Sequence, residues 1–241
     1  MRIEGRNAVR EALRSGMKVE RALMLKGIKP GGGIQEIQDL LGQQGLKVEY
    51  VQRRDLDNVS EYDAHQGVIV WVAPFEYASL GELIKKASAS APSLIIVLDH
   101  ITDPGNLGAI ARSAEVAGAS GIVVAKDRAA AITPAAHKAA AGALAYLPVV
   151  QVTNITRVIQ QLKEAGFWVA GASEHAEQLV WDAPLSGNIA LVMGSEGSGL
   201  SRLVREQCDF LVKLPQVGKV SSLNVAQAAT AITYEYLRQN R

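Results

Sequence analysis

This chain of 241 residues has almost no cysteine and no long hydrophobic run. The single cysteine, Cys208, cannot form an internal disulfide and is expected to have a plain structural role. The longest apolar stretches, residues 94–98 and 189–193, have the length of strands, far short of the roughly 20 residues that span a bilayer. The charged N-terminus lacks the apolar core of a secretory signal. These absences predict a cytoplasmic protein with no membrane partner.

An excess of charge of either sign is also missing. The chain carries 25 Lys and Arg against 24 Asp and Glu, so it is not basic overall, as many nucleic-acid binders are. Residues 1–29 nevertheless hold eight Lys and Arg against three Glu, a local net charge of +5. This cluster could neutralise phosphates or could form a solvated helix face, and charge alone does not separate the two interpretations.

Hydrophobic patterning predicts two α/β domains joined by a linker. In residues 1–73 we expect helices at 4–13 and 34–44, and strands at 21–25, 47–51 and 68–72. Residues 74–92 loosen into a short helix followed by small residues and proline, which is typical of a linker.

Residues 93–241 alternate between apolar strands and helices. Strands are expected at 94–98, 122–125, 149–152, 168–170, 189–193 and 210–214, and helices at 106–117, 134–144, 155–165, 200–207 and 224–237. Because the strands are apolar along their whole length, we expect a parallel sheet covered on both faces.

The first segment of chemical interest follows the strand at 94–98 and reads Asp103-Pro104-Gly105-Asn106. Ligands bind at the carboxyl ends of parallel strands, so Asn106 could either cap the next helix or face a ligand. Arg112 lies six residues further, far around the helix from Asn106. It could contact a substrate lying along the helix, or pair with Glu115 or another carboxylate.

The second segment, residues 194–199, is a glycine turn that contains Glu196. Its glycines do not form a dinucleotide fingerprint, and the lysine of a phosphate-binding loop is missing. Glu196 would repel a phosphate held by the loop amides. The turn therefore suits a neutral or cationic ligand such as S-adenosylmethionine (AdoMet) better than NAD or ATP.

The third segment, Ser221-Ser222-Leu223-Asn224, opens the last expected helix after a polar stretch at 216–222. Ser221 or Ser222 could simply cap that helix. The helix itself is rich in alanine and threonine, and such small side chains allow close packing against another backbone.

Taken together and in this order, the three segments resemble the motifs of the SpoU (TrmH) branch of the SPOUT methyltransferases. The opening stretch 3–13 and the later His65-Gln66-Gly67-Val68 resemble the substrate-binding domain of the bacterial members that methylate a guanosine ribose in 23S rRNA. The resemblance covers nearly the whole chain. It implies a small α/β domain similar to ribosomal protein L30e, followed by a parallel-sheet catalytic domain with a deep trefoil knot at about 189–230.

The resemblance also implies the activity. The enzyme would transfer a methyl group from AdoMet to the ribose 2'-hydroxyl of a guanosine in the peptidyl-transferase P loop of 23S rRNA, free or in a ribosome precursor. It would form a homodimer through the C-terminal domain. Alternatives are methylation of a tRNA or another rRNA nucleotide, a nicotinamide-dependent oxidoreductase, and a catalytically silent RNA-binding protein.

Family roles carry over to eight positions. The catalytic residues would be Asn106, Arg112, Glu196, Ser222 and Asn224, and main-chain groups of Gly194, Leu214 and Leu223 would hold AdoMet. An ordinary arginine cannot act as a base, so either the environment of Arg112 is unusual or a substrate phosphate takes the proton.

No metal is expected, because His100, His137 and His175 lack the spacing of a metal site. The chain departs from many relatives at His100, at Gly105 and at 216–218, positions that flank the implied reactive residues without removing any.

Overall fold

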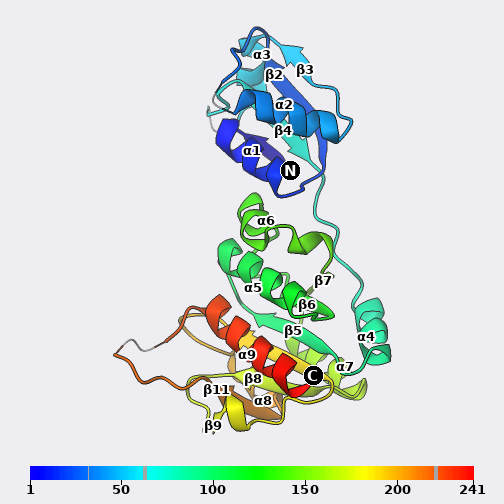
Figure 1. The fold of residues 1–241 in the computed structure, drawn as a ribbon, viewed down its shortest axis with the longest axis vertical. Coiled ribbons are helices and arrows are strands. Elements are labelled where there is room, and N and C mark those ends of the chain that lie inside the picture. The colour runs from blue at the N-terminus through cyan, green and yellow to red at the C-terminus, as the bar shows by residue number, and fades with distance from the viewer. Residues whose placement is uncertain (32, 62–63, 220–221) are drawn as a thin grey trace. The chain divides into compact units, whose positions relative to one another are not determined.

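A computed structural model of the protein divides into two compact units, Met1–Glu76 and Tyr77–Arg241 (Figure 1). It describes residues 1–31, 33–61, 64–219 and 222–241.

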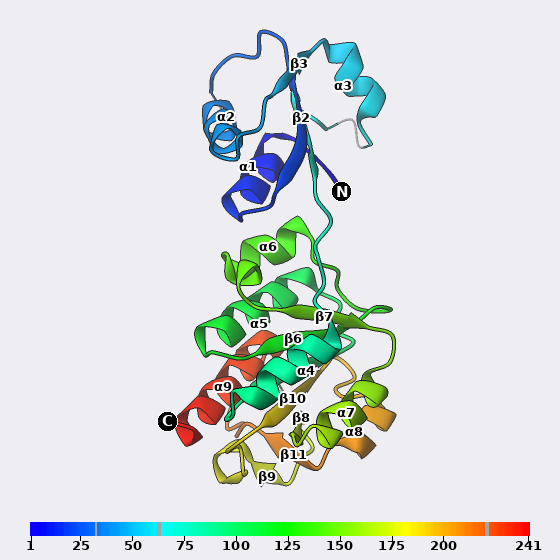
Figure 2. The same ribbon diagram turned by 90° about the vertical axis from the view of Figure 1, so that its right-hand side faces the viewer.

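The first unit is a four-stranded sheet of order β1-β4-β2-β3, in which only the β2 and β3 pair is parallel. Its strands are β1 (Arg2–Glu4), β2 (Val19–Leu25), β3 (Glu49–Val51) and β4 (Val68–Val72), and its helices are α1 (Arg6–Arg14), α2 (Ile34–Gln43) and α3 (Arg53–Val59). In Figure 2, α1 and α2 lie on one side of this sheet and α3 lies on the other.

Side chains that alternate between the two faces of β4 explain why helices pack on both sides of this sheet. Val68 and Val70 pack in the same core as α1 and α2, whereas Ile69 packs with Leu56 of α3. Successive side chains of a strand point to opposite faces, so this strand contributes to both cores. β1 and α3 were not predicted: a three-residue strand is too short to show a period, and α3 has a single buried residue, Leu56.

The second unit contains a seven-stranded sheet of order β7-β6-β5-β10-β8-β11-β9, and every pairing in it is parallel, as expected. Its strands are β5 (Leu94–Asp99), β6 (Gly121–Ala125), β7 (Val149–Val152), β8 (Trp168–Ala172), β9 (Gln178–Leu179), β10 (Ile189–Gly194) and β11 (Phe210–Lys213). β5, β6 and β10 are buried along their whole length. This burial matches a sheet covered on both faces.

Helices cover both faces of this sheet (Figure 2). One face carries α4 (Leu80–Ala89), α7 (Ile155–Glu164) and α8 (Arg202–Gln207), and the other carries α5 (Pro104–Val116), α6 (Pro134–Ala140) and α9 (Val225–Gln239), with short 3-10 turns at Ala143–Ala145 and Val180–Asp182. A Cβ added to Gly108 of α5 would lie 2.2 Å from the carbonyl oxygen of Ala136, so glycine is required where α5 packs on α6.

Helix α4 lies in the segment 74–92 that was expected to be a linker. Its Leu83 and Ala87 are buried in the same core as Ile95 and Val97 of β5. Ser79 caps the helix by accepting a hydrogen bond from the Glu82 amide. Of the small residues that suggested a linker, Ala87 is buried, whereas Ser88 and Ala89 lie on the exposed side of this helix, which belongs to the second unit.

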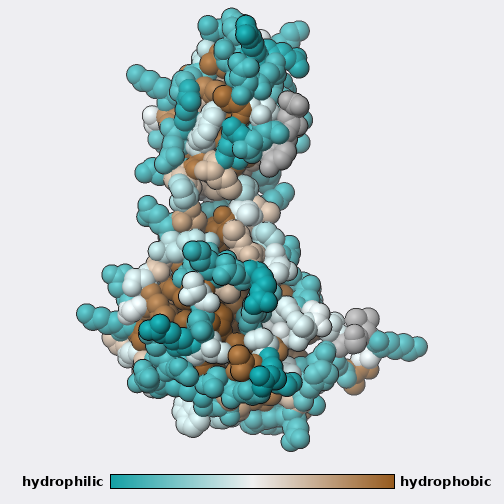
Figure 3. Space-filling view, turned by 180° about the vertical axis from the view of Figure 1, so that it is seen from behind, coloured by the Kyte–Doolittle hydropathy of each residue, from teal (hydrophilic) through white to brown (hydrophobic). Residues whose placement is uncertain are grey.

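Hydrophilic residues cover most of the face shown in Figure 3, with hydrophobic residues exposed in patches between them. Each helix in the described part of the chain is too short or too polar to span a bilayer.

Candidate active site

Two loops meet because their strands are neighbours. β5 and β10 run parallel, and their register places Gly194 beside Asp99 at their carboxyl ends. The loop after β5 leads into α5, whose N-cap is Asp103: its side chain accepts a hydrogen bond of 2.9 Å from the Asn106 amide. Asn106 therefore does not cap α5, and its side chain is available to the second loop.

A hydrogen-bond cluster joins the three predicted segments. Glu196 Oε1 accepts from Asn106 Nδ2 at 3.1 Å and from Asn224 Nδ2 at 2.7 Å. Asn224 Nδ2 also donates to Asn106 Oδ1 at 2.8 Å. The same Glu196 oxygen accepts from the Val225 amide at 3.3 Å. Side chains that lie far apart in the sequence thus share one network.

Asn224 also begins the last helix. Its Oδ1 accepts from the amides of Ala226 and Gln227, so Asn224 is the N-cap of α9. Ser222, one of the two expected caps, does not cap the helix, and Ser221 lies outside the described residues. Asparagine is as good an N-cap as serine, and here it leaves the amide nitrogen free to bind Glu196.

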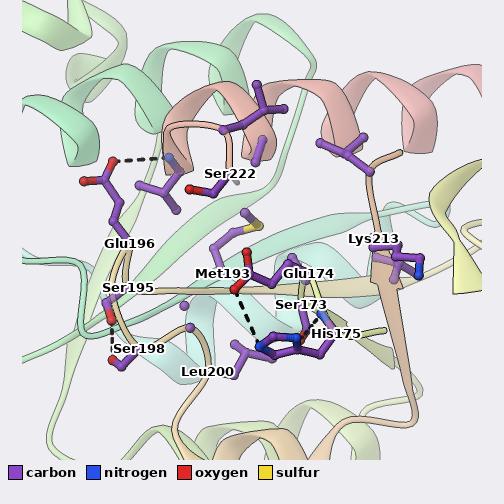
Figure 4. Close-up of a pocket in the computed structure, with 18 of the residues that line it drawn as sticks. Ser173, Glu174, His175, Met193, Ser195, Glu196, Ser198, Leu200, Lys213 and Ser222 are labelled. Atoms are coloured by element: carbon purple, nitrogen blue, oxygen red, sulfur yellow. Dashed lines mark hydrogen bonds and ion pairs between the residues drawn. The ribbon is translucent and has the colours of Figure 1, made fainter. Parts of the chain in front are cut away.

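A cavity of about 200 Å³ opens beside this cluster (Figure 4). Five predicted residues line it, namely Gly194, Glu196, Leu214, Ser222 and Leu223. In Figure 4, Glu196 and Ser222 lie near the start of α9, Lys213 lies on the opposite side of the view, and His175 lies lower, close to Ser173.

Gly194 permits the tight turn that forms one wall. A Cβ at this position would lie 2.2 Å from the Gly199 carbonyl carbon, so no larger residue fits. Ser195 and Gly199 exchange backbone hydrogen bonds of 3.1 and 2.9 Å, which fold the loop back on itself. The glycine turn is therefore a closed hairpin that presents Glu196 outward.

Sequence reasoning missed other residues that line this cavity. They are the polar Glu174, His175, Lys213 and Gln216 and the apolar Met193, Leu200, Val212, Val225 and Ile232. Several of them follow or end β8, which lies beside β10 in the sheet, and β11, which lies on the other side of β8. The sequence order does not reveal this neighbourhood, because β8 precedes β10 in the chain and β11 follows it.

A second cavity, of about 680 Å³, lies against the same loop. Residues 195–199 and Val225 line both cavities, and Asn106 lines only the second. Glu196 therefore faces two spaces of different volume. Such an arrangement suits a donor and an acceptor that meet at Glu196.

Asp99 holds together the two loops that line these cavities, and it was not predicted from the sequence. It is fully buried, and its Oδ2 accepts a 2.7 Å hydrogen bond from the Ser201 amide. Its other oxygen lies 2.6 Å from His100 Nδ1. One buried carboxylate thus fixes the loop after β10 to the loop after β5.

Arg112 lies apart from the cluster. It is exposed on α5 and lines neither cavity. Within the described residues it forms no hydrogen bond or ion pair, so the expected pairing with Glu115 is not present. Any contact with a substrate must come from one that extends along α5.

Within the described residues, no group of three or more His, Cys, Asp and Glu could hold a metal ion. His175 is 81% exposed in its side chain and lies 3.5 Å from Glu174.

Comparison with known proteins identifies the family. The SpoU rRNA methylase family matches residues 93–234, and the RNA 2'-O ribose methyltransferase substrate-binding family matches residues 2–78. A protein of Bacillus subtilis, YacO, assigned to the TrmH family of tRNA/rRNA methyltransferases, is 42% identical over 98% of this chain and 94% of its own length. A Staphylococcus haemolyticus protein with the same assignment is 40% identical over 98% of this chain and 95% of its own.

Solved structures agree. The SpoU methyltransferase AviRb of Streptomyces viridochromogenes, crystallised with AdoMet, matches with a TM-score of 0.71 and 28% identity over 100% of this chain and 91% of that one. An RNA 2'-O ribose methyltransferase matches with a TM-score of 0.66 and 29% identity, covering 99% and 88% of the two chains.

The residues around the smaller cavity fit AdoMet. Apolar side chains such as Met193 and Ile232 suit its adenine and methionine chain, and the turn after Gly194 has no phosphate-binding pattern. The nicotinamide-dependent alternative is wrong, because the family matches span both parts of the chain. The chain belongs to the SpoU (TrmH) family of AdoMet-dependent RNA methyltransferases.

Proposed function

We propose that this enzyme methylates the ribose 2'-hydroxyl of a guanosine in the peptidyl-transferase P loop of 23S rRNA, either free or in a ribosome precursor. The observation that carries the proposal is the position of Glu196, bonded to Asn106 and Asn224 at the boundary of two cavities. Support for an RNA ribose comes from the N-terminal match to a 2'-O ribose methyltransferase substrate-binding family.

The proposed division of labour follows the two cavities. Main-chain groups of Gly194, Leu214 and Leu223 hold AdoMet in the smaller one, and Ser222 completes its rim near Glu196. When bound, AdoMet supplies a methyl group already activated on a sulfonium. The protein then has to align the ribose hydroxyl and lower the cost of losing its proton.

Asn106, Glu196 and Asn224 are well placed for that alignment. The Glu196 carboxylate holds both amide side chains in fixed orientations, with donors and acceptors ready for the ribose hydroxyls. In this proposal Asn106 orients the ribose or its neighbouring phosphate. Arg112 positions the RNA further along α5, and a substrate phosphate can take the proton that a permanently charged guanidinium cannot accept.

The wider organisation is part of the same proposal. Residues 1–73 bind the RNA, residues 93–241 form the catalytic domain, and two copies pair through that domain in the cytoplasm. We propose the trefoil knot at about 189–230 on the family resemblance, because this stretch includes residues 220 and 221, which lie outside the described residues.

A second target class has its own support. The similar proteins of Bacillus subtilis and Staphylococcus haemolyticus are named for tRNA/rRNA methylation without a choice between the two. A tRNA ribose or a different rRNA ribose is therefore the alternative substrate for the same chemistry.

One experiment separates these targets. The gene is deleted, and ribose methylation is mapped in 23S rRNA and tRNA by alkaline hydrolysis, which a 2'-O-methyl group blocks at its own nucleotide. We expect one protected P-loop guanosine to become cleavable and to regain protection when the gene is restored. An unchanged 23S rRNA pattern contradicts the proposed target, and a lost tRNA signal supports the alternative.

A further inference from the structure

Two residues on the wall of the larger cavity have an unusual backbone. His100 has a φ of 61° and Arg128 a φ of 52°, and they are two of the four non-glycine residues with positive φ among those described. This conformation is uncommon for residues with a Cβ and often marks functional sites. Both residues line the cavity that contains Asn106 and Glu196.

The two residues belong to neighbouring loops. His100 follows β5 and Arg128 follows β6, and these strands are paired in parallel. A backbone hydrogen bond of 2.7 Å from the Ala130 amide to the Ile101 carbonyl ties the two loops together. His100 and Arg128 thus lie on two joined loops that line the same cavity.

The His100 ring is held by one nitrogen only. Its Nδ1 lies 2.6 Å from Oδ1 of the fully buried Asp99, and its side chain is 33% exposed. Within the described residues, Nε2 has no partner. The buried carboxylate therefore fixes the ring and leaves Nε2 available to a ligand, as an outer carboxylate does for many functional histidines.

Arg128 is a free cation. It is exposed, and its guanidinium has no hydrogen bond or ion pair among residues 1–31, 33–61, 64–219 and 222–241. The acidic residues on the same cavity wall, Asp103 and Glu196, already accept hydrogen bonds from the Asn106 amide and from the cluster described above. An unpaired guanidinium suits a phosphate, which it can bind through two parallel hydrogen bonds.

We propose that His100 and Arg128 bind one backbone phosphate of the RNA and so hold the strand in register over Asn106 and Glu196. The proposal rests on the proposed function, since it assigns the larger cavity to the RNA. In it both residues position the substrate and neither touches AdoMet, because neither lines the smaller cavity.

The test compares three variants of the full-length enzyme. Arg128→Ala removes the charge, and Arg128→Lys keeps the charge but not the paired donors. His100→Asn removes Nε2 with little change of backbone, because asparagine tolerates positive φ. Lys86→Ala is the control, since Lys86 is an exposed cation on α4 and lines neither cavity.

Kinetics use an unmethylated 23S rRNA transcript. We expect Arg128→Ala and His100→Asn to raise the KM for RNA about tenfold, with Arg128→Lys in between, consistent with one charge-assisted hydrogen-bond pair. AdoMet affinity, measured by calorimetry, should equal that of Lys86→Ala. The proposal is overturned if the KM for RNA is unchanged in both Arg128→Ala and His100→Asn. It is also overturned if AdoMet affinity falls by the same factor as the KM for RNA rises.

A binding measurement separates this proposal from the target assignment. RNA affinity is measured against salt concentration on whichever RNA the wild type binds, 23S rRNA or tRNA transcripts. Loss of one phosphate contact should reduce the slope of log affinity against log salt by about 0.7 to 0.9 for Arg128→Ala. A reduced slope without methylation of 23S rRNA supports the phosphate contact and contradicts the target, whereas an unchanged slope contradicts the contact.

Discussion

The side-chain nitrogen of Asn224 donates a hydrogen bond of 2.7 Å to Glu196 Oε1. The side-chain oxygen of Asn224 accepts hydrogen bonds from the amides of Ala226 and Gln227 and so caps α9. One side chain therefore connects the start of the last helix to the loop after β10. Because the same nitrogen also donates to Asn106 Oδ1, the orientation of three polar side chains depends on where α9 begins. In the proposed function, helix capping and substrate alignment are therefore coupled at this residue.

Glu196→Gln tests the cluster directly. The variant keeps the shape of the side chain but loses the charge that binds two amide nitrogens and the Val225 amide. We expect the rate of methyl transfer to fall about 100-fold through misalignment, while AdoMet affinity falls far less. Single-turnover kinetics and calorimetry measure the two quantities, and a rate close to that of the wild type would show that the charge is dispensable.

Asn224→Asp separates the two roles of Asn224. Aspartate caps a helix as well as asparagine does, so thermal stability should stay close to that of the wild type. Its carboxylate repels Glu196 and cannot donate, so methyl transfer should fall about 100-fold. The control is Ser79→Ala, which removes the α4 cap and should cost about 1 kcal/mol of stability without changing the rate. Equal rate loss in both variants would indicate a purely structural effect.

Gly194→Ala should disrupt the donor cavity. The added Cβ would lie 2.2 Å from the Gly199 carbonyl carbon and 2.3 Å from the Leu200 nitrogen, so the loop must move. We expect a loss of about 1 to 3 kcal/mol in the free energy of unfolding and a loss of AdoMet binding. Gly81→Ala in α4 is the matched control, because its Cβ meets only Ser79 Oγ at 3.9 Å and alanine favours helices. Normal AdoMet binding by Gly194→Ala would mean that the cavity does not hold the donor.

Arg112→Ala should abolish methyl transfer and leave AdoMet affinity nearly intact. The residue is exposed and lines neither cavity, so its removal leaves the fold and the donor site undisturbed. We expect a loss of at least about 100-fold in kcat/KM for RNA. Equal losses of AdoMet binding and activity would instead assign Arg112 a structural role.

Alkaline stability should depend on Cys208. Burial raises the pKa of its thiol from an ordinary 9.0 to about 12. Between these values the unfolded chain has released this proton and the folded chain has not, so stability is full below about pH 9 and falls as pH rises toward 12. Burial raises the pKa of Tyr236 to about 12 as well, with the same sign. In Cys208→Ala, the drop in melting temperature from pH 8 to pH 11 should be smaller than in the wild type, and an equal drop would contradict the assignment.

Periodicity predicted most of the second unit because its strands are apolar and its helices are regularly spaced. β7 of this unit, like β4 of the first unit, matches its expected range residue for residue. The short β1 and the single-residue core of α3 left no periodic signal. The short helix expected within 74–92 is α4, but it belongs to the second unit.

The site also contains residues that the sequence predicted and residues that it did not. The predicted Asn106, Glu196 and Asn224 lie together as the segment order indicated. Asp99 was not predicted because it stood just after the expected strand 94–98, and its role depends on Ser201, about 100 residues later in the chain. The position of Arg112 could not be read from spacing, since helix geometry fixes its angle around α5 but not what lies opposite.

The hairpin at residues 195–199 lines both cavities, so in the proposed function the two ligands share the same few backbone groups. If AdoMet orders this hairpin, RNA no longer has to do so, and its affinity rises without any new contact. Thermodynamic reciprocity then requires RNA to strengthen AdoMet binding by the same factor. Under the proposed function, a hairpin shared by donor and acceptor would make the enzyme cooperative for its two different substrates.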